Sequence, residues 1–227
     1  MNNLDKLDIN HFLSSSDISK QDTLKILELA YKFKKNEIEV NVGKKILGLI
    51  FEKASTRTRV SFQVAMSRLG GNSIDLNPDT AQIKRGEPIK DTARVLGRYF
   101  DVLAVRANSH EDLKEYAKWS NKPVINALTN LEHPCQALAD YLTIKEEFGD
   151  FKNISLTFIG DGNNVAHSLM LCGSLLGVNI RIACPLGFEP DSSVISKAKE
   201  INPNANLLIT NDIEKSIKDT HILYTDV

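Results

Sequence analysis

The sequence predicts an α/β protein with two doubly wound parallel-sheet domains, the second of them incomplete in this chain. Short apolar runs alternate with amphipathic stretches along the 227 residues, and this alternation is typical of parallel strands joined by helices. The length suits one large domain or two modest ones, and the stretch "GDFKN" at 149–153 separates two such runs of elements. We therefore predict a first domain at residues 1–148 and a second at 149–227.

The first domain is expected to begin with a helix and then to alternate strands with helices. "KILGLIF" is an apolar run of strand length, and the helix from about Thr56 ends at the pair Gly70–Gly71. Pro88 suits the first turn of the next helix, because its missing N–H would have no partner there. The expected elements are helix 21–35, strand 45–51, helix 56–69, strand 73–76, helix 88–100, strand 102–106, helix 111–120, strand 123–128 and helix 134–148.

The second domain is expected to repeat the same alternation and to finish on a strand at the last residue. In open α/β sheets, ligand-binding loops follow the carboxyl ends of the strands. A chain that stops at the carboxyl end of its last strand lacks the loop that would follow it. We therefore expect the C-terminal part of this domain to be missing from the chain. The expected elements are strand 154–160, helix 163–176, strand 179–184, helix 191–200, strand 206–210, helix 212–219 and strand 221–227.

Composition excludes several classes of protein. The formal net charge is −1, so the chain has no overall basic field for nucleic acid or an anionic membrane, and any anion site must be local. The first ten residues carry acids without an apolar core, unlike a signal peptide, and no apolar run reaches membrane-spanning length. Three cysteines in an odd count without zinc spacing indicate a reducing compartment, so we expect a cytoplasmic protein. We expect no cofactor, and no His/Cys/carboxylate cluster in the sequence argues for a metal.

A local anion site is predicted in "FEKASTRTRVSF" at 51–62, where a strand leads into a helix. Ser55, Thr56, Arg57 and Thr58 form the first turn, whose N–H groups have no partner within the helix. The helix dipole contributes about 0.3–1 kcal/mol, whereas a hydrogen bond to a charged group contributes about 1.5–3 kcal/mol. Arg57 should therefore dominate. Arg57 and Arg59 lie two residues apart on the helix and cannot both face one ligand, so one of them is expected to have a structural part.

Two further polar clusters follow strands of the same predicted sheet. Arg106 ends the strand 102–106, at the edge where open α/β sheets bind ligands. In "HPCQ", His133 precedes a helix that starts at Pro134, and Gln136 lies three residues on, so both side chains can reach one point. A histidine at a helix start is often only a cap, but three polar clusters after successive strands indicate a binding site.

These motifs resemble a known family. "STRTR", "KDTARVLGR" and "HPCQALAD", in this order and spacing, are similar to the aspartate/ornithine carbamoyltransferase family, from "HFLSSSDIS" to "TDV". The resemblance implies that Ser55, Thr56, Arg57 and Thr58 bind the phosphate of carbamoyl phosphate. It further implies that Arg106 and His133 hold and polarise its carbonyl oxygen and that Gln136 holds its amide. Gln82 matches a position that reaches the neighbouring subunit's active site, which implies a homotrimer at least.

The resemblance also indicates the acceptor. The loop "GDGNNVAHS" has no Arg for the carboxylates of aspartate, and it resembles the ornithine enzymes, in which Asn164 contacts the amino-acid end of ornithine. Asp226 matches an acid that pairs with the α-amino group of ornithine, and a carboxylate there would repel aspartate. The expected reaction converts carbamoyl phosphate and L-ornithine to L-citrulline and phosphate. This chemistry is the same in arginine biosynthesis and in arginine breakdown.

The chain departs from the family at two places. Cys135 stands where Thr is usual, and we interpret it as a tolerated small residue, since the reaction needs no thiol ester. The Trp, Ser-Met-Gly, His-Cys-Leu-Pro and late Arg of the ornithine enzymes do not follow "TDV".

Other functions remain open at this point. The acceptor could be aspartate, putrescine or N-acetylornithine in place of ornithine. "GDGNNV" at 160–165 after a strand also suggests a dinucleotide-dependent oxidoreductase, although Val165 replaces the third glycine of the fingerprint and no acid follows the second strand. A binding or regulatory protein that keeps the anion site without catalysis is the third possibility.

Overall fold

The computed structural model of the chain describes residues 7–76, 86–204 and 206–226. Packing groups these residues into two compact units, each with its own sheet. Among the described residues, unit 1 comprises 7–13, 38–76 and 86–127, and unit 2 comprises 14–37, 128–204 and 206–226. The expected domain boundary at 148–149 follows the order of elements along the chain and stays a prediction. Among the described helices, none is long and apolar enough to cross a membrane.

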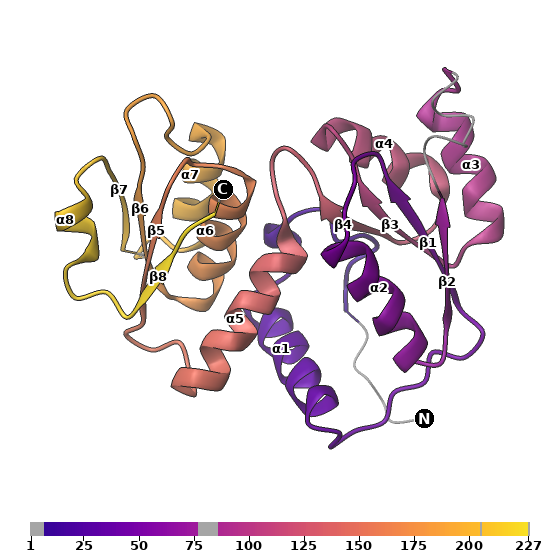
Figure 1. Cartoon of the computed structure of the whole chain (residues 1–227), viewed down its shortest axis with the longest axis horizontal. Coiled ribbons are helices and arrows are strands. Elements are labelled where there is room, and N and C mark those ends of the chain that lie inside the picture. The colour runs from indigo at the N-terminus through magenta and orange to yellow at the C-terminus, as the bar shows by residue number, and fades with distance from the viewer. Residues whose placement is uncertain (1–6, 77–85, 205, 227) are drawn as a thin grey trace. The chain divides into compact units, whose positions relative to one another are not determined.

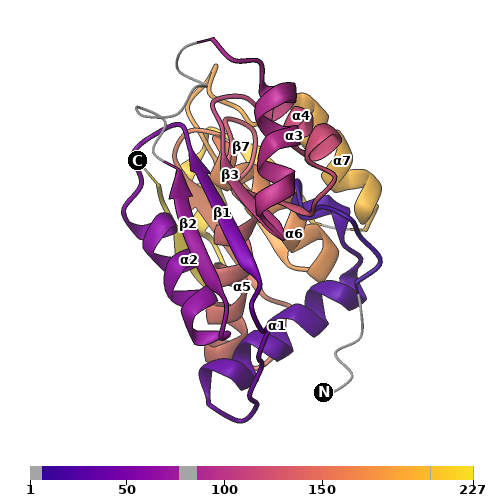
Figure 2. The ribbon, with the colours of Figure 1, turned by 90° about the vertical axis from the view of Figure 1, so that its right-hand side faces the viewer.

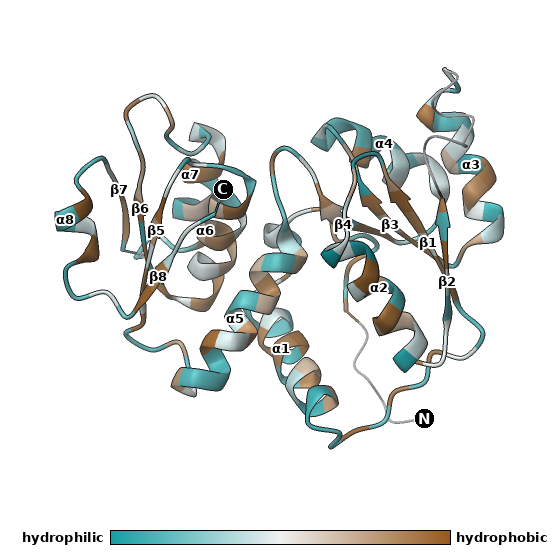
Figure 3. Cartoon of the chain, in the orientation of Figure 1, coloured by the Kyte–Doolittle hydropathy of each residue, from teal (hydrophilic) through white to brown (hydrophobic). Residues whose placement is uncertain are grey.

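Unit 1 is built on a four-stranded parallel sheet with the order β2-β1-β3-β4. Hydrophobic residues concentrate on β1 and β3, the central strands (Figure 3). The segment around Phe12 runs alongside β4, where its N–H donates to the Val124 carbonyl over 2.8 Å. The elements are β1 (Ile46–Phe51), α2 (Arg57–Arg68), β2 (Asn72–Leu76), α3 (Ile89–Tyr99), β3 (Val102–Arg106), α4 (His110–Ser120) and β4 (Val124–Leu128).

Helices cover both faces of this sheet because alternate residues of β1 point to opposite sides. Ile50 packs with α3 and α4, whereas Leu49 and Phe51 pack with Met66 of α2. Figures 1 and 2 show α2 on one side of the sheet and α3 with α4 on the other. Gly48 allows this packing, since a Cβ there would lie 2.6 Å from a ring carbon of Phe100. The sheet of unit 1 is therefore doubly wound, as predicted.

Unit 2 has a second four-stranded parallel sheet with the order β7-β6-β5-β8. Its core lies between the sheet and the helices α5, α6 and α7, and the short α8 packs on β5, β6 and β7. The elements are a 3₁₀ turn η1 (Ser15–Asp17), α1 (Lys20–Lys34), α5 (Pro134–Phe148), β5 (Ser155–Ile159), α6 (Asn164–Leu176), β6 (Asn179–Ala183), α7 (Ser192–Ile201), β7 (Leu207–Thr210), α8 (Ile213–Ile217) and β8 (Ile222–Tyr224).

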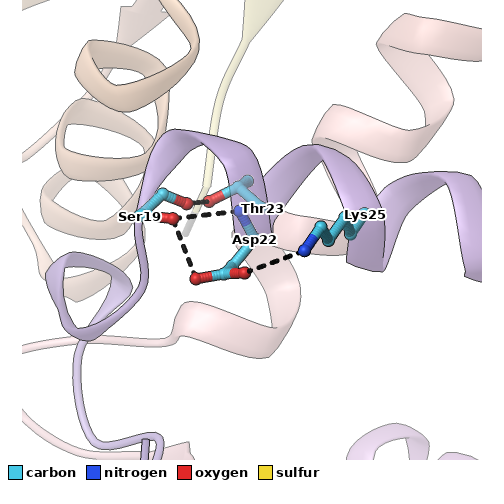
Figure 4. A network of polar contacts seen from close by, with 4 residues as sticks. All are labelled: Ser19, Asp22, Thr23 and Lys25. Atoms are coloured by element: carbon cyan, nitrogen blue, oxygen red, sulfur yellow. Dashed lines mark hydrogen bonds and ion pairs between the residues drawn. The ribbon is translucent and has the colours of Figure 1, made fainter. Parts of the chain in front are cut away.

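Local sequence explains where α1 begins. The Ser19 hydroxyl accepts the Asp22 N–H at 3.1 Å and donates to the Asp22 carboxylate at 2.8 Å (Figure 4). Thr23 donates to the Ser19 carbonyl at 2.8 Å, and Lys25 lies 3.9 Å from the Asp22 carboxylate. The capping serine satisfies an N–H group that a helix otherwise leaves unpaired, and Asp22 holds the serine hydroxyl in place.

The predicted α/β class and every predicted helix and strand are confirmed, with most ends within one residue of the prediction. Two elements end earlier: the helix expected at 212–219 ends at Ile217, and the last strand was expected to continue to the final residue. It ends at Tyr224, because only Leu156, Thr157 and Phe158 of β5 pair with β8. Thr225 and Asp226 therefore leave the sheet as a loop at its carboxyl edge.

Candidate active site

The loop from β1 into α2 holds the residues of unit 1 that the sequence predicts to bind an anion. Ser55 is half-buried, and Thr56 is exposed and already helical at φ −89° and ψ −57°. Within the described residues, no side chain accepts a hydrogen bond from the first turn of α2. The N–H groups and the positive end of the helix dipole are therefore left for a ligand. Asn163 and Ser109 cap α6 and α4 in the usual way.

The two arginines of "STRTR" have different roles, as expected. Arg59 lies 3.2 Å from the Asp75 carboxylate of β2, and its guanidinium stacks over the Phe51 ring at 5.5 Å. Arg57 is exposed and forms no ion pair with any of the described residues. Arg59 therefore joins α2 to the sheet, and the charge of Arg57 remains available for an anion.

Arg106 lies at the same sheet edge as this loop. It is the residue of β3 that pairs with Phe51, the last residue of β1, and its carbonyl accepts the Glu52 N–H at 3.0 Å. The guanidinium is partly desolvated, which lowers the pKa of Arg106, and the structure shows no partner for its Nε in the described part of the chain. A buried donor without a partner fits a site for an anionic or carbonyl oxygen.

Glu52 belongs to this edge, although the motif analysis did not single it out. One of its carboxylate oxygens accepts both the Asn108 N–H at 2.8 Å and the Asn108 side-chain amide at 2.9 Å. Glu52 thereby fixes the loop after Arg106, and desolvation raises the pKa of its carboxyl group. An acid directly after a buried strand is the only signal that the sequence offers for this role.

In unit 2, His133 and Gln136 lie at the N-terminus of α5. Pro134 occupies the first helical position, as predicted. His133 is buried, and its backbone N–H donates to the Ser168 hydroxyl of α6 at 2.8 Å. The Gln136 side-chain amide donates to the Asp140 carboxylate one turn further along α5 at 2.9 Å.

The first turns of α6 hold the loop 129–133 that precedes α5. Asn164 donates to the Thr129 carbonyl at 2.6 Å, and the His167 Nδ1 lies 2.8 Å from the Leu131 carbonyl. The Asp191 N–H donates to the His167 Nε2 at 2.9 Å, so the ring proton must sit on Nδ1 and the ring is neutral. Desolvation lowers the pKa of His167, which agrees with this neutral state.

The two residues predicted to bind the acceptor amine, Asn164 and Asp226, lie at the carboxyl edge of the second sheet. Asp226 follows β8, and its carboxylate accepts the Asn163 side-chain amide at 3.1 Å. Asn163 also caps α6 by accepting the N–H groups of Val165 and Ala166 at 3.0 and 3.1 Å. The Asn164 amide is engaged by Thr129, which leaves its side-chain oxygen as the group for a ligand.

Within each unit the predicted residues gather at one edge. Unit 1 brings Arg106 beside the loop with Ser55, Thr56, Arg57 and Thr58. In unit 2, His133 and Asn164 belong to one network, because hydrogen bonds hold both ends of the loop 129–133 to α6. Gln136 is linked to β8 through Asp140, which accepts hydrogen bonds from Gln136 and from Tyr224. Gln82 lies outside the described residues.

The thiols and the loop after β5 bear on the alternative chemistries. Desolvation raises the pKa of Cys135 to about 12, so its thiol is protonated at neutral pH and is no activated nucleophile. The described residues include no group of three or more His, Cys, Asp or Glu able to hold a metal ion. At the start of α6, the Asn163 side chain occupies the N–H groups that a dinucleotide pyrophosphate would need. This arrangement argues against the oxidoreductase hypothesis.

Comparison with known proteins gives two family models. Residues 10–146 match the carbamoyl-P binding domain of the aspartate/ornithine carbamoyltransferases, and residues 152–227 match the Asp/Orn binding domain of the same proteins. The two matches meet close to the stretch "GDFKN" at 149–153.

Individual relatives agree with these models. The chain is 67% identical over 218 residues to an ornithine carbamoyltransferase of Prochlorococcus marinus subsp. pastoris, covering 96% of this chain and 71% of that protein. It is 52% identical to the ornithine carbamoyltransferase of Nostoc punctiforme, over 95% of this chain and 70% of the relative. The solved ornithine carbamoyltransferase of Gloeobacter violaceus superposes with a TM-score of 0.91 at 47% identity, covering 98% of this chain and 75% of that one.

Proposed function

The chain belongs to the aspartate/ornithine carbamoyltransferase family, and we propose that the residues above carry out its reaction. The enzyme transfers the carbamoyl group of carbamoyl phosphate to the side-chain amine of L-ornithine, giving L-citrulline and phosphate, a reaction of arginine metabolism. The open first turn of α2, with Arg57 unpaired among the described residues, is the observation that best supports the proposed residue roles.

The phosphate of carbamoyl phosphate is assigned to the N-terminus of α2. The N–H groups of its first turn and the hydroxyls of Ser55, Thr56 and Thr58 donate to the phosphate oxygens. Arg57 adds a forked, charged donor, whose hydrogen bonds contribute about 1.5–3 kcal/mol. Helix N-termini bind phosphate in this way in many proteins.

The carbamoyl carbonyl is assigned to Arg106 and His133, with Thr58 as a further donor. Attack by a neutral amine on the carbamoyl carbon gives a tetrahedral intermediate that expels phosphate, and negative charge builds on the former carbonyl oxygen. Donors fixed before the reaction stabilise that charge without rearranging in the transition state. Within its own unit, each residue has a fixed backbone: the His133 N–H donates to the Ser168 hydroxyl, and Arg106 pairs with Phe51.

Ornithine is assigned to Asn164 and Asp226. A carboxylate attracts the α-amino group of a diamino acid and repels the second carboxylate of aspartate. No arginine occurs between residues 160 and 168, where an aspartate-binding loop would need one. The side-chain amine of ornithine, with a pKa near ~10.4, must lose its proton before it attacks.

A homotrimer and a cytoplasmic location complete the proposal. Gln82 matches a position that reaches the active site of a neighbouring subunit, and exposed apolar side chains of unit 1 suit an interface with such a subunit. These are Val60 and Val64 on α2 and Ile74 on β2. Cys172 and Cys184 are free thiols, as a reducing compartment would keep them.

Replacing Arg57 tests the proposal directly. Arg57→Gln keeps the side-chain length but removes the charge, so the KM for carbamoyl phosphate should rise roughly 10- to 100-fold, with a smaller change in the KM for ornithine. Arg68→Gln is the matched control, because Arg68 is the last residue of the same helix. The measurement is carbamoyl transfer, followed as citrulline formation with ornithine and as phosphate release with aspartate, putrescine and N-acetylornithine as rival acceptors. Equal effects of the two substitutions would contradict the phosphate assignment.

A further inference from the structure

Asp140 is a carboxylate to which neither the sequence motifs nor the proposed reaction gives a role. It lies on α5, one turn after Gln136, and both of its oxygens accept a hydrogen bond. The Gln136 Nε2 donates to Oδ1 at 2.9 Å, and the Tyr224 hydroxyl donates to Oδ2 at 3.0 Å. Tyr224 is the last residue of β8 and stacks on Phe158 of β5, with ring centroids 5.8 Å apart. Asp140 is therefore held from the helix and from the sheet of unit 2.

The chemistry of these groups fixes the direction of the Gln136 amide. An ionised carboxylate only accepts hydrogen bonds, whereas a glutamine amide donates through Nε2 and accepts through Oε1. Gln136 must therefore turn its NH₂ end to Asp140, and Oε1 is the end that remains for a ligand. An amide without this neighbour could rotate by half a turn and present either end.

The direction matters because the ligand assigned to Gln136 also carries an amide. The NH₂ of a carbamoyl group donates, so it needs an acceptor such as Oε1 opposite it. If Gln136 presented its NH₂ end instead, two hydrogen-bond donors, this NH₂ and that of the carbamoyl group, would face each other without an acceptor. Replacing the NH₂ of the ligand by a methyl group would leave Oε1 desolvated and unpaired, which costs binding energy.

We propose that Asp140 is a positioning residue that orients Gln136 to accept a hydrogen bond from the NH₂ of the carbamoyl group. Asp140 thereby selects acyl phosphates that carry an amide over isosteric ones that carry a methyl group. The inference rests on the proposed function, in which Gln136 contacts the carbamoyl amide.

The charge of Asp140 is balanced between opposing effects. Desolvation is the largest and raises the pKa of Asp140, while the hydrogen bonds from Gln136 and Tyr224 lower it; Asp226, a nearby like charge, raises it further. The two donated bonds stabilise the ionised form that the orientation of Gln136 requires.

A pair of isosteric inhibitors tests the inference. Phosphonoacetamide carries a C(=O)NH₂ group and acetonylphosphonate a C(=O)CH₃ group in the same place, and both should compete with carbamoyl phosphate. The parent protein should bind phosphonoacetamide more tightly. In Asp140→Asn, whose amide pairs with either end of Gln136, the ratio of the two inhibition constants should fall roughly 10-fold. The KM for carbamoyl phosphate should rise, and the KM for ornithine should stay near the parent value.

The control makes the same chemical change elsewhere on the helix. Glu147→Gln also converts a carboxylate to an amide on α5, at an exposed position, and should leave the ratio unchanged. Thermal unfolding shows whether Asp140→Asn is folded. If it is not, Asp140→Ser replaces it, and the ratio of the two inhibition constants should fall in the same way, because a hydroxyl pairs with either end of an amide.

The outcomes separate the inference from the proposed function. A lowered ratio in the Asp140 variant and an unchanged one in the control support the role of Asp140. If the Asp140 variant binds both inhibitors more weakly but keeps the parent ratio, Asp140 is merely structural and the inference is wrong. If neither inhibitor competes with carbamoyl phosphate in the parent protein, the proposed function fails and the inference falls with it.

Discussion

The helices α2 and α6 occupy the same place in their two units and have opposite surroundings. Each follows the first strand of its sheet, β1 or β5, through a short loop. Nearly every residue of α6 is buried and Asn163 caps its N-terminus, whereas Met66 is the buried residue of α2 and no described side chain caps that helix. The same strand–loop–helix connection thus supplies a rigid support in one unit and, in the other, a helix start with unpaired N–H groups that suits the proposed anion site.

The two helices differ in capping because they differ in burial, which decides whether the N–H groups of the first turn can remain unpaired within the protein. A buried helix needs its end groups paired within the protein, because unpaired N–H groups away from water are costly. An exposed helix can leave them to water until a ligand replaces the water. The apolar sequence "NVAHSLMLCGSLL" therefore comes with a capping asparagine, and the polar "RTRVSFQVAMSR" comes with hydroxyls and an available arginine.

The largest expected effect concerns packing. Leu169→Ala in α6 removes a fully buried side chain and should lower the free energy of unfolding by about 2–5 kcal/mol. Ser67→Ala in α2, where the side chain is exposed, should change it by less than about 0.5 kcal/mol. Chemical denaturation of both variants measures this contrast. Similar losses at the two positions would mean that α2 is as deeply packed as α6.

The next effect concerns catalysis at the edge of unit 1. Arg106→Ala removes a proposed donor to the oxyanion and should raise the activation free energy by about 2.7–4 kcal/mol, a loss of roughly 10²–10³-fold in turnover. The protein should remain folded, since the backbone pairing of Arg106 with β1 does not need its side chain. Steady-state citrulline formation is the measurement. Near-normal turnover would refute the assignment of Arg106.

The smallest effect concerns the two helix starts themselves. Asn163→Ala removes the cap of α6 and should destabilise the protein by about 0.5–2 kcal/mol. Thr56→Ala removes no cap, so stability should hardly change, while the KM for carbamoyl phosphate should rise. Thermal unfolding and steady-state kinetics of the two variants sharpen the comparison. A stability loss in Thr56→Ala as large as in Asn163→Ala would show that α2 is capped after all.

Periodicity and turn residues predicted the order of elements well, because each strand and helix follows from local patterns. The apolar run before Glu52 becomes β1, and Pro134 begins α5 at its first residue. The last strand was predicted too long, because its end depends on how far β5 extends beside it rather than on the residues of β8. The pairing partner of a strand is not a local property.

Side-chain roles were predicted less completely than backbone elements. The spacing of Arg57 and Arg59 correctly indicated that one of them is structural, but only Asp75 and Phe51, both distant in sequence, identify it as Arg59. Asn164 was assigned to the acceptor alone, yet its amide holds Thr129. Asp140 and Glu52 lie within the quoted motifs but were given no role there, because Tyr224 and Asn108 reach them only in the folded chain.

The sequence by itself determined the α/β class, the order of the helices and strands with most of their ends, and the family with its reaction, because local periodicity and contiguous motifs carry that information. Only the tertiary structure decided which polar atoms are already engaged and which remain for a ligand. Hydrogen bonds between residues far apart in the chain, such as Asp140 with Tyr224 and Asn163 with Asp226, depend on sheet order and packing. No local pattern encodes such contacts.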